Sequence, residues 1–234
     1  MPAASTPPGD AAQHPPGTEP VPAERIWDAS AGAGADGIDA AILDAAAECV
    51  LAFGVRRTSL TAVARRASVS RPTVYRRWPD LTALVADVMT RQWTAAFAAA
   101  VPDRSDFATA REFAVTAIVA VVRALRVHPL LVKIIDVDPE LLQPYIFDRL
   151  GTGQRRALEF LTVQVADGQA DGSVRSGEPA TLALTVLLAA QSFVFCGRVA
   201  AGGRGGPDAA DAELAVLVDS YLCPPASSSE ERSG

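Results

Sequence analysis

The segment 59–84 constrains the fold most, because two short helical patterns follow one another across a very short connection. It reads SLTAVARRASVSRPTVYRRWPDLTAL. Val63 and Ala67 fall on one face of a first helix, and Val74 and Trp78 fall on one face of a second. Two short helices joined by a turn of about three residues must cross steeply, which predicts a helix-turn-helix arrangement.

Capping residues set the register of these helices. Ser59 and Ser70 each precede a helix and can accept a hydrogen bond from a backbone N–H left unpaired in the first turn. Pro72 falls in the first turn of the second helix, where a missing N–H costs little. Asp80 can cap the next helix in the same way, and Val69 is expected to fill the corner of the turn.

The same segment is locally basic, although the chain as a whole is acidic. The 234 residues include 27 Asp and Glu against 21 Lys and Arg, a net charge of −6 that by itself argues against nucleic acid as a partner. Between residues 54 and 78, however, there are seven arginines and no acidic residue. Charge runs usually only solvate a surface, but this one coincides with the two-helix pattern, so we interpret it as a DNA-binding surface.

The exposed face of the second helix is expected to contact DNA. Arginines and hydroxyl groups at the start of such a helix suit the major groove, where Arg can pair with guanine and Thr can contact the thymine methyl group. Hydroxyl groups and helix N-terminal amides also suit phosphate, which positions a protein without reading sequence. The predicted DNA-binding residues are Ser59, Ser70, Arg71, Pro72, Thr73, Tyr75, Arg76 and Arg77.

Helical periodicity continues along the chain and no alternating strand pattern occurs, so we predict an all-α fold. The first helix is expected to end at Gly54, with Asp36 or Asp39 capping its start. Further helices are expected at about 59–67, 70–78, 80–100, 106–127, 139–170, 178–199 and 208–222. The stretch 139–170 can hold two helices, broken near 151–153.

Composition divides the chain into four parts. Residues 1–35 are rich in Pro and Ala and have almost nothing to bury, so they are expected to form a disordered tail. Residues 36–80 are expected to form a three-helix DNA-binding domain, and 81–223 a larger helical domain. A second disordered tail is expected at 224–234, which is rich in Ser and Glu.

From its first helical segment to the start of the helix expected at 80–100, the chain resembles the tetracycline-repressor-like (TetR) transcriptional regulators. The resemblance rests on ILDAAAECVLAFG, VRRT and SLTAVARRASVSRPTVYRRWPDLTALV, which together span 42–85, about a fifth of the chain. Family members usually have a turn glycine where this chain has Ser68, which predicts a turn with positive φ that a small polar residue can adopt. They often have a lysine that contacts a DNA phosphate where this chain has Leu81, and leucine cannot make that contact.

The resemblance implies a repressor that binds a palindromic operator as a homodimer and is released by a small effector bound in 81–223. Dimerisation is expected through about residues 178–222. The apolar stripes there are Leu184, Leu188, Gln191 and Phe195, and Leu214, Val218 and Tyr221. Core packing within one chain is the alternative for each stripe. Ligand binding is expected to change the spacing of the two recognition helices through the helix 80–100.

A ligand cavity needs apolar walls with a few polar groups. The candidates are Trp93, Phe97, Phe113, Phe160, Gln164, Phe193 and Cys196. Ordinary core packing is the commoner role for each of these residue types. The predominance of Ala, Val, Leu and Phe in this region predicts an apolar ligand.

No catalytic residue, metal site or cofactor is expected. The acidic group around Asp138 and Glu140 is interpreted as the start of a helix, with Asp138 as N-cap, rather than as metal ligands. His128, before a proline, is interpreted as a helix-end residue. Two other classes of function stay open, a helical adaptor that binds protein partners without DNA and a small-molecule enzyme, but neither explains the arginine-rich segment.

The cysteines and the hydropathy pattern indicate a cytoplasmic protein without a membrane partner. Cys49, Cys196 and Cys223 lack metal-ligand spacing and are interpreted as buried thiols in a reducing compartment rather than as redox sensors. No secretory signal is visible, and no apolar run reaches the roughly 20 residues that a spanning helix needs.

Overall fold

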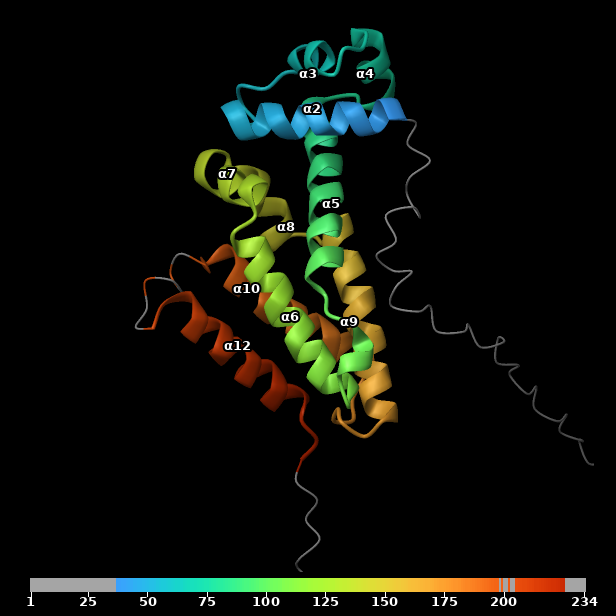
Figure 1. The fold of residues 1–234 in the computed structure, drawn as a ribbon, viewed down its shortest axis with the longest axis vertical. Coiled ribbons are helices and arrows are strands. Elements are labelled where there is room, and N and C mark those ends of the chain that lie inside the picture. The colour runs from blue at the N-terminus through green and yellow to red at the C-terminus, as the bar shows by residue number, and fades with distance from the viewer. Residues whose placement is uncertain (1–36, 198, 200–201, 203–204, 226–234) are drawn as a thin grey trace, which may run out of the picture.

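The computed structural model describes residues 37–197, 199, 202 and 205–225, and every element in these ranges is an α-helix or a short 3-10 helix (Figure 1). The all-α prediction is confirmed. The expected tail 1–35, the candidate cap Asp36 and most of the expected tail 224–234 lie outside the described residues. Helix labels follow Figure 1.

Three helices form one end of the molecule: α2 (Gly37–Phe53), α3 (Leu60–Arg66) and α4 (Arg71–Arg77). Figure 1 shows α2 lying across the head of α5, with α3 and α4 on its outer side. The predicted caps are confirmed: the side chain of Ser59 accepts from the Ala62 amide, at 3.1 Å, and that of Ser70 from the Thr73 amide, at 3.3 Å. The helix-turn-helix therefore forms from locally encoded signals.

Two turn positions behave as their residue types predict. Gly54 follows α2 with φ +80°, and its amide donates to the carbonyl of Val50, as expected of a glycine that ends a helix. Ser68, in the turn between α3 and α4, has φ +57° and is the non-glycine residue with positive φ in the described chain. The expected positive φ at the position of the family's turn glycine is therefore confirmed.

The larger part of the molecule is a layered helical bundle. Helix α5 (Leu81–Ala100), capped by Asp80, runs from α2 into a body made of α6 (Ala110–Arg126), α9 (Thr152–Ala170), α10 (Pro179–Phe195) and α12 (Gly206–Leu222) (Figure 1). Phe113 of α6 and Phe160 of α9 are almost fully buried, with ring centres 6.0 Å apart in an edge-on contact. This body holds the larger share of the hydrophobic core.

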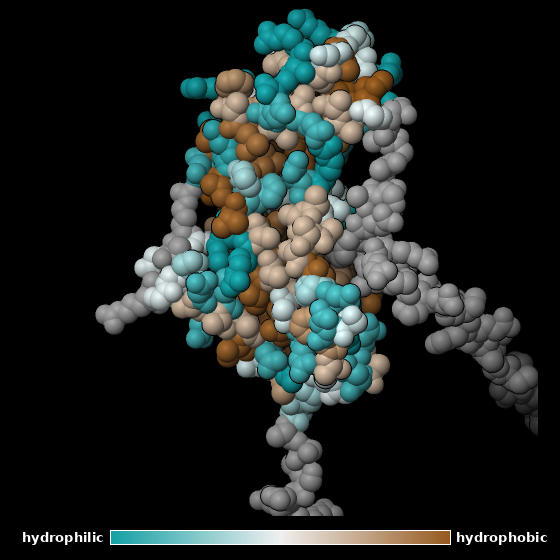
Figure 2. Space-filling model, in the orientation of Figure 1, coloured by the Kyte–Doolittle hydropathy of each residue, from teal (hydrophilic) through white to brown (hydrophobic). Residues whose placement is uncertain are grey.

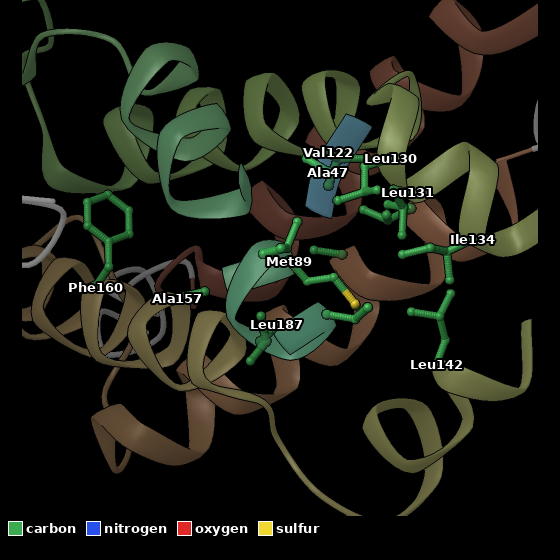
Figure 3. Packing of buried hydrophobic residues seen from close by; sticks show 14 of the residues in the cluster. Ala47, Met89, Val122, Leu130, Leu131, Ile134, Leu142, Ala157, Phe160 and Leu187 are labelled. Atoms are coloured by element: carbon green, nitrogen blue, oxygen red, sulfur yellow. The ribbon is translucent and has the colours of Figure 1, made fainter. Parts of the chain in front are cut away.

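A helix that the sequence pattern did not predict joins the two parts. Helix α7 (Pro129–Val137) begins at a proline, in the first turn where proline is tolerated, and buries Leu130, Leu131 and Ile134. The expected stretch 139–170 divides into the 3-10 helix η3 (Pro139–Leu141), the short α8 (Gln143–Phe147) and α9. Figure 3 shows α7 residues in one hydrophobic cluster with Ala47 of α2 and Met89 of α5. The core therefore runs without interruption from α2 into the body.

The two apolar stripes predicted for the interface differ in how far the structure exposes them. On α10, Leu184 and Leu188 are exposed, as an interface requires, whereas Gln191 and Phe195 of the same stripe are only partly exposed. On α12, however, Leu214 and Val218 are fully buried within the chain, because that face packs toward α6 and α10. The exposed large apolar residues of α12 are instead Val216 and Leu217. The stripe predicted on α12 therefore packs within the chain, which is the alternative given for it, and does not present an interface.

The cysteine interpretation is correct only for Cys49. Cys49 is buried and packs in the α2 core, but Cys196 and Cys223 are exposed because they lie at the C-terminal ends of α10 and α12. Among the described helices none is by itself long and apolar enough to cross a membrane, although α6 and α7, bent by 57° at their junction, pass together on length and composition.

Candidate DNA-binding surface and ligand cavity

The outer face of α4 is polar and open. Arg71, Tyr75 and Arg76 are exposed, whereas Val74 on the opposite face is fully buried and fixes the helix against α2 and α3. The hydroxyl groups of Ser70 and Thr73 lie 2.7 Å apart at the start of α4. Figure 2 shows strongly hydrophilic residues capping this end of the molecule. The arrangement offers donors at a helix N-terminus to a phosphate backbone.

Four of the seven arginines have no acidic partner among the described residues. These are Arg57, Arg65, Arg71 and Arg76, and all four are exposed. Unpaired arginines on one end of an otherwise acidic protein concentrate positive potential there. This is the charge distribution that binding to a nucleic acid requires.

The other three arginines pair with acids that come from outside the segment. Arg77 pairs with Asp39 of α2 and is only partly exposed, so its expected place on the open face of α4 is wrong. Arg66 pairs with Glu48 of α2, and Arg56 pairs with Glu140 of η3. Because these acids lie far away in the sequence, inspection of 54–78 alone could not find them.

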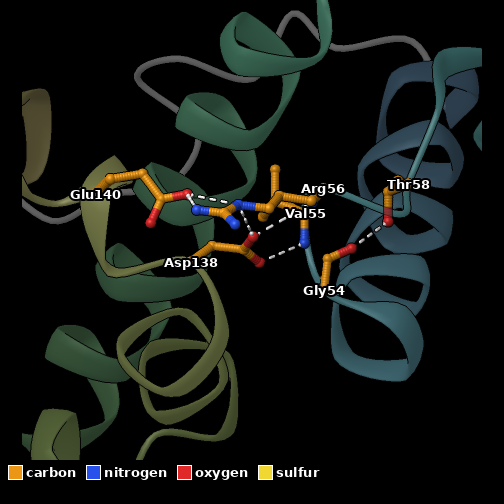
Figure 4. Close-up of polar contacts among 6 residues, drawn as sticks. All are labelled: Gly54, Val55, Arg56, Thr58, Asp138 and Glu140. Carbon is orange, nitrogen blue, oxygen red and sulfur yellow. Dashed lines mark hydrogen bonds and ion pairs between the residues drawn. The ribbon is translucent and has the colours of Figure 1, made fainter.

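The connection between α2 and α3 is held by a buried carboxylate from the body of the molecule (Figure 4). Asp138, whose side chain is 1% exposed, accepts from the backbone amide of Val55 at 2.7 Å and from that of Arg56 at 3.4 Å. The guanidinium of Arg56 donates to Glu140, at 2.5 Å from Nη2. Hydrogen bonds from its own backbone and from Arg56 lower the pKa of Glu140, so it is ionised at neutral pH.

This contact corrects the role expected for Asp138. The residue does stand at the start of η3, but its side chain makes no cap there. It is turned toward the α2–α3 connection instead, because two backbone amides in that connection need an acceptor. His128 lies between α6 and α7 at the N-cap position of α7, as its helix-end interpretation requires, and burial lowers its pKa.

A partly open pocket, which we call the apolar cavity, lies between α5, α6, α9 and α10 and has a volume of about 100 Å³. Three of the predicted ligand residues line it, namely Trp93, Phe97 and Phe160. Tyr145 of α8, Leu131 of α7 and Gln191 of α10 line it as well. None of the described residues that line it is Asp, Glu, Lys, Arg or His.

Four predicted ligand residues do not line this cavity. Phe113 and Gln164 are buried in the surrounding core, Phe193 packs partly buried against it, and Cys196 is exposed. For Phe113 and Phe193, core packing is the role that the structure gives them. Tyr145 was missed, because it comes from a short helix that the periodicity did not resolve.

A second space, which we call the polar hollow, adjoins the apolar cavity. It has a volume of about 190 Å³ and shares Trp93, Tyr145 and Gly153 with the cavity. Its rim includes the charged residues Asp87, Arg149 and Arg155. The two spaces together resemble a small-molecule site, with mostly apolar walls and a few polar groups at one end.

Comparison with known proteins identifies the chain. The sequence model described as "Bacterial regulatory proteins, tetR family" matches residues 42–88. The HTH-type transcriptional regulator Mb2274c of Mycobacterium bovis, itself uncharacterized, is 41% identical over 182 residues, which are 78% of this chain and 93% of that protein. The chain belongs to the TetR family. Rv2250c of Mycobacterium tuberculosis, a regulator of the same description, is 40% identical with the same coverage.

Solved structures of TetR-family proteins share the fold. The transcriptional repressor QsdR of R. erythropolis superposes with a TM-score of 0.58 at 15% identity, covering 80% of this chain and 96% of its own. A complex of SmeT with triclosan superposes with a TM-score of 0.54 at 19% identity, covering 79% and 90%. A putative regulator from Saccharomonospora viridis in complex with choline also has a TM-score of 0.54, at 17% identity, covering 79% and 97%.

The family assignment identifies the role of the helices at the arginine-rich end of the molecule. This TetR-family protein is a DNA-binding transcriptional regulator, and α3 and α4 are its helix-turn-helix. Leu81, at the place of the family's frequent lysine, is partly buried and packs against the core, so it presents no charge to a phosphate.

Proposed function

We propose that this regulator binds a palindromic operator as a homodimer and represses transcription until a small molecule enters the apolar cavity. The observation that carries the proposal is the open face of α4, where Arg71 and Arg76 are exposed on a helix-turn-helix and have no acidic partner in the part of the chain that the structure describes. A protein-binding adaptor would leave these two arginines without a role. The DNA target places the action of the protein in the cytoplasm.

Contacts with DNA are assigned to the start of α3 and the open face of α4. Ser59, Ser70, Thr73 and Tyr75 supply hydroxyl groups suited to phosphate, and Pro72 lies beside them on the surface. Arg71 and Arg76 can reach base edges, where arginine pairs with guanine. Arg77 contributes only by leaving Asp39, so we rank it below the other two arginines.

Dimerisation is assigned to the exposed faces of α10 and α12. Leu184 and Leu188 are 37% and 52% exposed, and Val216 and Leu217 are 59% and 47% exposed. These side chains gain most by burial against a second copy of the same surface, because a twofold interface is self-complementary. Two α4 helices would then meet two half-sites of a palindrome.

The effect of ligand binding can be transmitted to the DNA-binding helices through α7. Leu131 of α7 lines the apolar cavity, and the same helix leads to Asp138, which holds the connection between α2 and α3. A ligand that prefers a shifted α7 would therefore favour a different placement of the helix-turn-helix. We accordingly treat residues 36–80 as the DNA-binding domain and 81–223 as the effector and dimerisation domain.

The test is binding to the DNA upstream of the protein's own gene, measured by fluorescence anisotropy. Arg76→Ala should weaken binding by roughly tenfold to a hundredfold, because loss of a base or phosphate contact costs about 1–3 kcal/mol. Arg175→Ala removes an equal charge from the connection between α9 and α10, at the other end of the molecule, and should leave binding unchanged. Equal losses for both variants would reduce the interaction to non-specific charge and overturn the assignment of α4.

A further inference from the structure

We propose that the effector is an elongated amphipathic molecule, with an uncharged hydrocarbon body in the apolar cavity and an anionic, oxygen-bearing end in the polar hollow. The inference rests on the proposed function insofar as it gives that regulator its ligand. It depends on which side chains line each space and on how the two spaces join.

The apolar cavity selects against charge. Its described walls come mostly from Trp, Phe, Leu, Ile, Val and Ala side chains, among them Ala157, Phe160 and Leu187 (Figure 3), with glycine and uncharged polar residues for the remainder. An ionised group enclosed by such walls would lose its hydration with no countercharge, which costs several kcal/mol. The part of the ligand that lies here is therefore neutral and mostly hydrocarbon.

One residue that borders both spaces also favours a ligand with an acceptor. The indole Nε1 of Trp93 is buried and has no hydrogen-bond partner among the described residues. This atom is a donor, and buried donors are ordinarily paired. An oxygen at the end of the ligand that lies in the polar hollow can supply the missing acceptor, whereas a further donor cannot.

The polar hollow favours a negative end. The guanidinium of Arg155 donates to the Leu150 carbonyl, at 2.5 Å, and to the hydroxyl of Thr152, at 3.2 Å, but neither Arg155 nor Arg149 has a described carboxylate partner. Arg149 lies over the ring of Tyr145, 5.5 Å from its centre. Asp87, the acid at this rim, already accepts from the indole of Trp78 at 2.8 Å. Positive charge therefore exceeds negative charge around the hollow.

The two spaces meet at three residues, which sets the shape of the ligand. Trp93, Tyr145 and Gly153 border both, so the two spaces adjoin, and a ligand that occupies both must be elongated and must pass beside these three residues. At Gly151, on the same rim, an added Cβ would lie 3.1 Å from the Tyr145 ring, so any side chain there would displace the ring that borders both spaces. Together the volumes approach the lower end of small-molecule pockets, about 300 Å³, which suits a single chain rather than a fused-ring system.

The experiment compares three probes with the same ten-carbon chain on the full-length protein at neutral pH, by isothermal titration calorimetry. Decanoate should bind roughly tenfold more tightly than decan-1-ol, because a charge-assisted hydrogen bond to arginine adds about 1.4 kcal/mol or more. Decyltrimethylammonium should bind most weakly. The double variant Arg149→Ala/Arg155→Ala should reduce the affinity for decanoate to that for decanol and leave decanol unchanged.

The matched control is Arg57→Ala/Arg76→Ala, which removes two exposed arginines from the DNA-binding end and should not alter any of the three affinities. The ligand class is overturned if the cation binds as tightly as decanoate, if the double variant at the rim has no effect, or if neither decanoate nor decanol binds. Decanoate that binds as expected but leaves the affinity for DNA unchanged would support the ligand class and contradict release from the operator, so the two failures are distinguishable.

Discussion

Gly54 is a single residue on which the junction of the two parts depends. Its φ of +80° suits glycine, and its neighbours add a second constraint: a Cβ there would lie 2.9 Å from Cγ1 of Val137 and 3.0 Å from Oδ2 of Asp138. Ser68, in contrast, has a positive φ but is exposed. A side chain at Gly54 would therefore strain the backbone and also push α7 away from α2.

Gly54→Ala should lower the free energy of unfolding by about 2–3 kcal/mol, the sum of a strained backbone and an overpacked contact. Urea unfolding followed by circular dichroism measures the change. Gly37→Ala, at the start of α2 where an added Cβ meets nothing, is the matched control and should change stability by less than about 0.5 kcal/mol. Equal effects at both glycines would show that the close approach to α7 is unimportant.

Asp138 attaches the end of α7 to the connection between α2 and α3, so its removal tests how far the placement of these helices depends on one side chain. Asp138→Ala leaves the amides of Val55 and Arg56 without their acceptor and should cost about 1–3 kcal/mol of stability. Hydrogen exchange should accelerate strongly at the Val55 amide. A general loss of stability would accelerate exchange throughout the protein, so an increase confined to this connection is specific to the lost contact.

Glu140→Gln tests whether the exposed part of this contact matters. It removes the charge from the partner of Arg56 but keeps Asp138, and exposed ion pairs contribute little. Exchange at Val55 should therefore stay close to that of the unmodified protein. Acceleration as large as that in Asp138→Ala would assign the contact to the ion pair rather than to the buried carboxylate.

Local signals explain which elements could be predicted from the sequence. The caps at Ser59, Ser70 and Asp80 act within three residues, so they were readable and are confirmed. Helix α7 was missed because its nine residues between Pro129 and Pro139 offer little more than two turns of periodicity. The pairing of Arg77 with Asp39 was not predictable, because it depends on how α4 packs beside α2.

For the candidate site, too, local features could be predicted from the sequence, whereas features that depend on how helices pack could not. The open face of α4 follows from the helical repeat around the buried Val74, so most of its residues were predictable. Residues of α5, α6, α7, α8, α9 and α10 together form the cavity, and only three of them could be named from their type. On α12 the apolar stripe chosen from sequence faces inward, because periodicity finds an apolar face but does not say what covers it.

At the level of the assembled molecule, the proposed dimer makes DNA binding depend on α10 and α12. Leu188→Glu/Leu217→Glu places a charge on each exposed apolar face and should convert the protein to monomer in sedimentation velocity. Operator affinity should fall by at least a hundredfold, because one half-site alone is then bound. Leu51→Glu changes a leucine of α2 that is also exposed, at 41%, and should leave the sedimentation coefficient unchanged. A dimer that survives the double change would place the interface elsewhere.

Acid sensitivity of the whole fold should depend on Asp211, which ties α12 to α6. Its side chain is 2% exposed and accepts from Arg126, at 2.8 and 3.0 Å, and from Arg123, at 3.0 Å. Burial acts to raise the pKa of Asp211, but the hydrogen bonds and charges of Arg126 and Arg123 outweigh it, and the pKa is lowered. The stabilisation is therefore complete above the unfolded pKa, near 4, and is lost as the pH falls through the lower folded pKa.

Asp211→Asn should reduce the free energy of unfolding by about 2–3 kcal/mol at pH 7, because two arginines lose their charged acceptor. Below about pH 4 the unmodified protein loses the same contribution, so the difference between the two should shrink as the pH falls. Urea unfolding at pH 7, 5, 4 and 3 measures it. Asp208→Asn removes a neighbouring carboxylate that is 92% exposed and 3.8 Å from Arg123, and it should have little effect at any pH. A difference for Asp211→Asn that stays constant from pH 7 to 3 would mean that packing of the side chain, and not its charge, holds α12 in place.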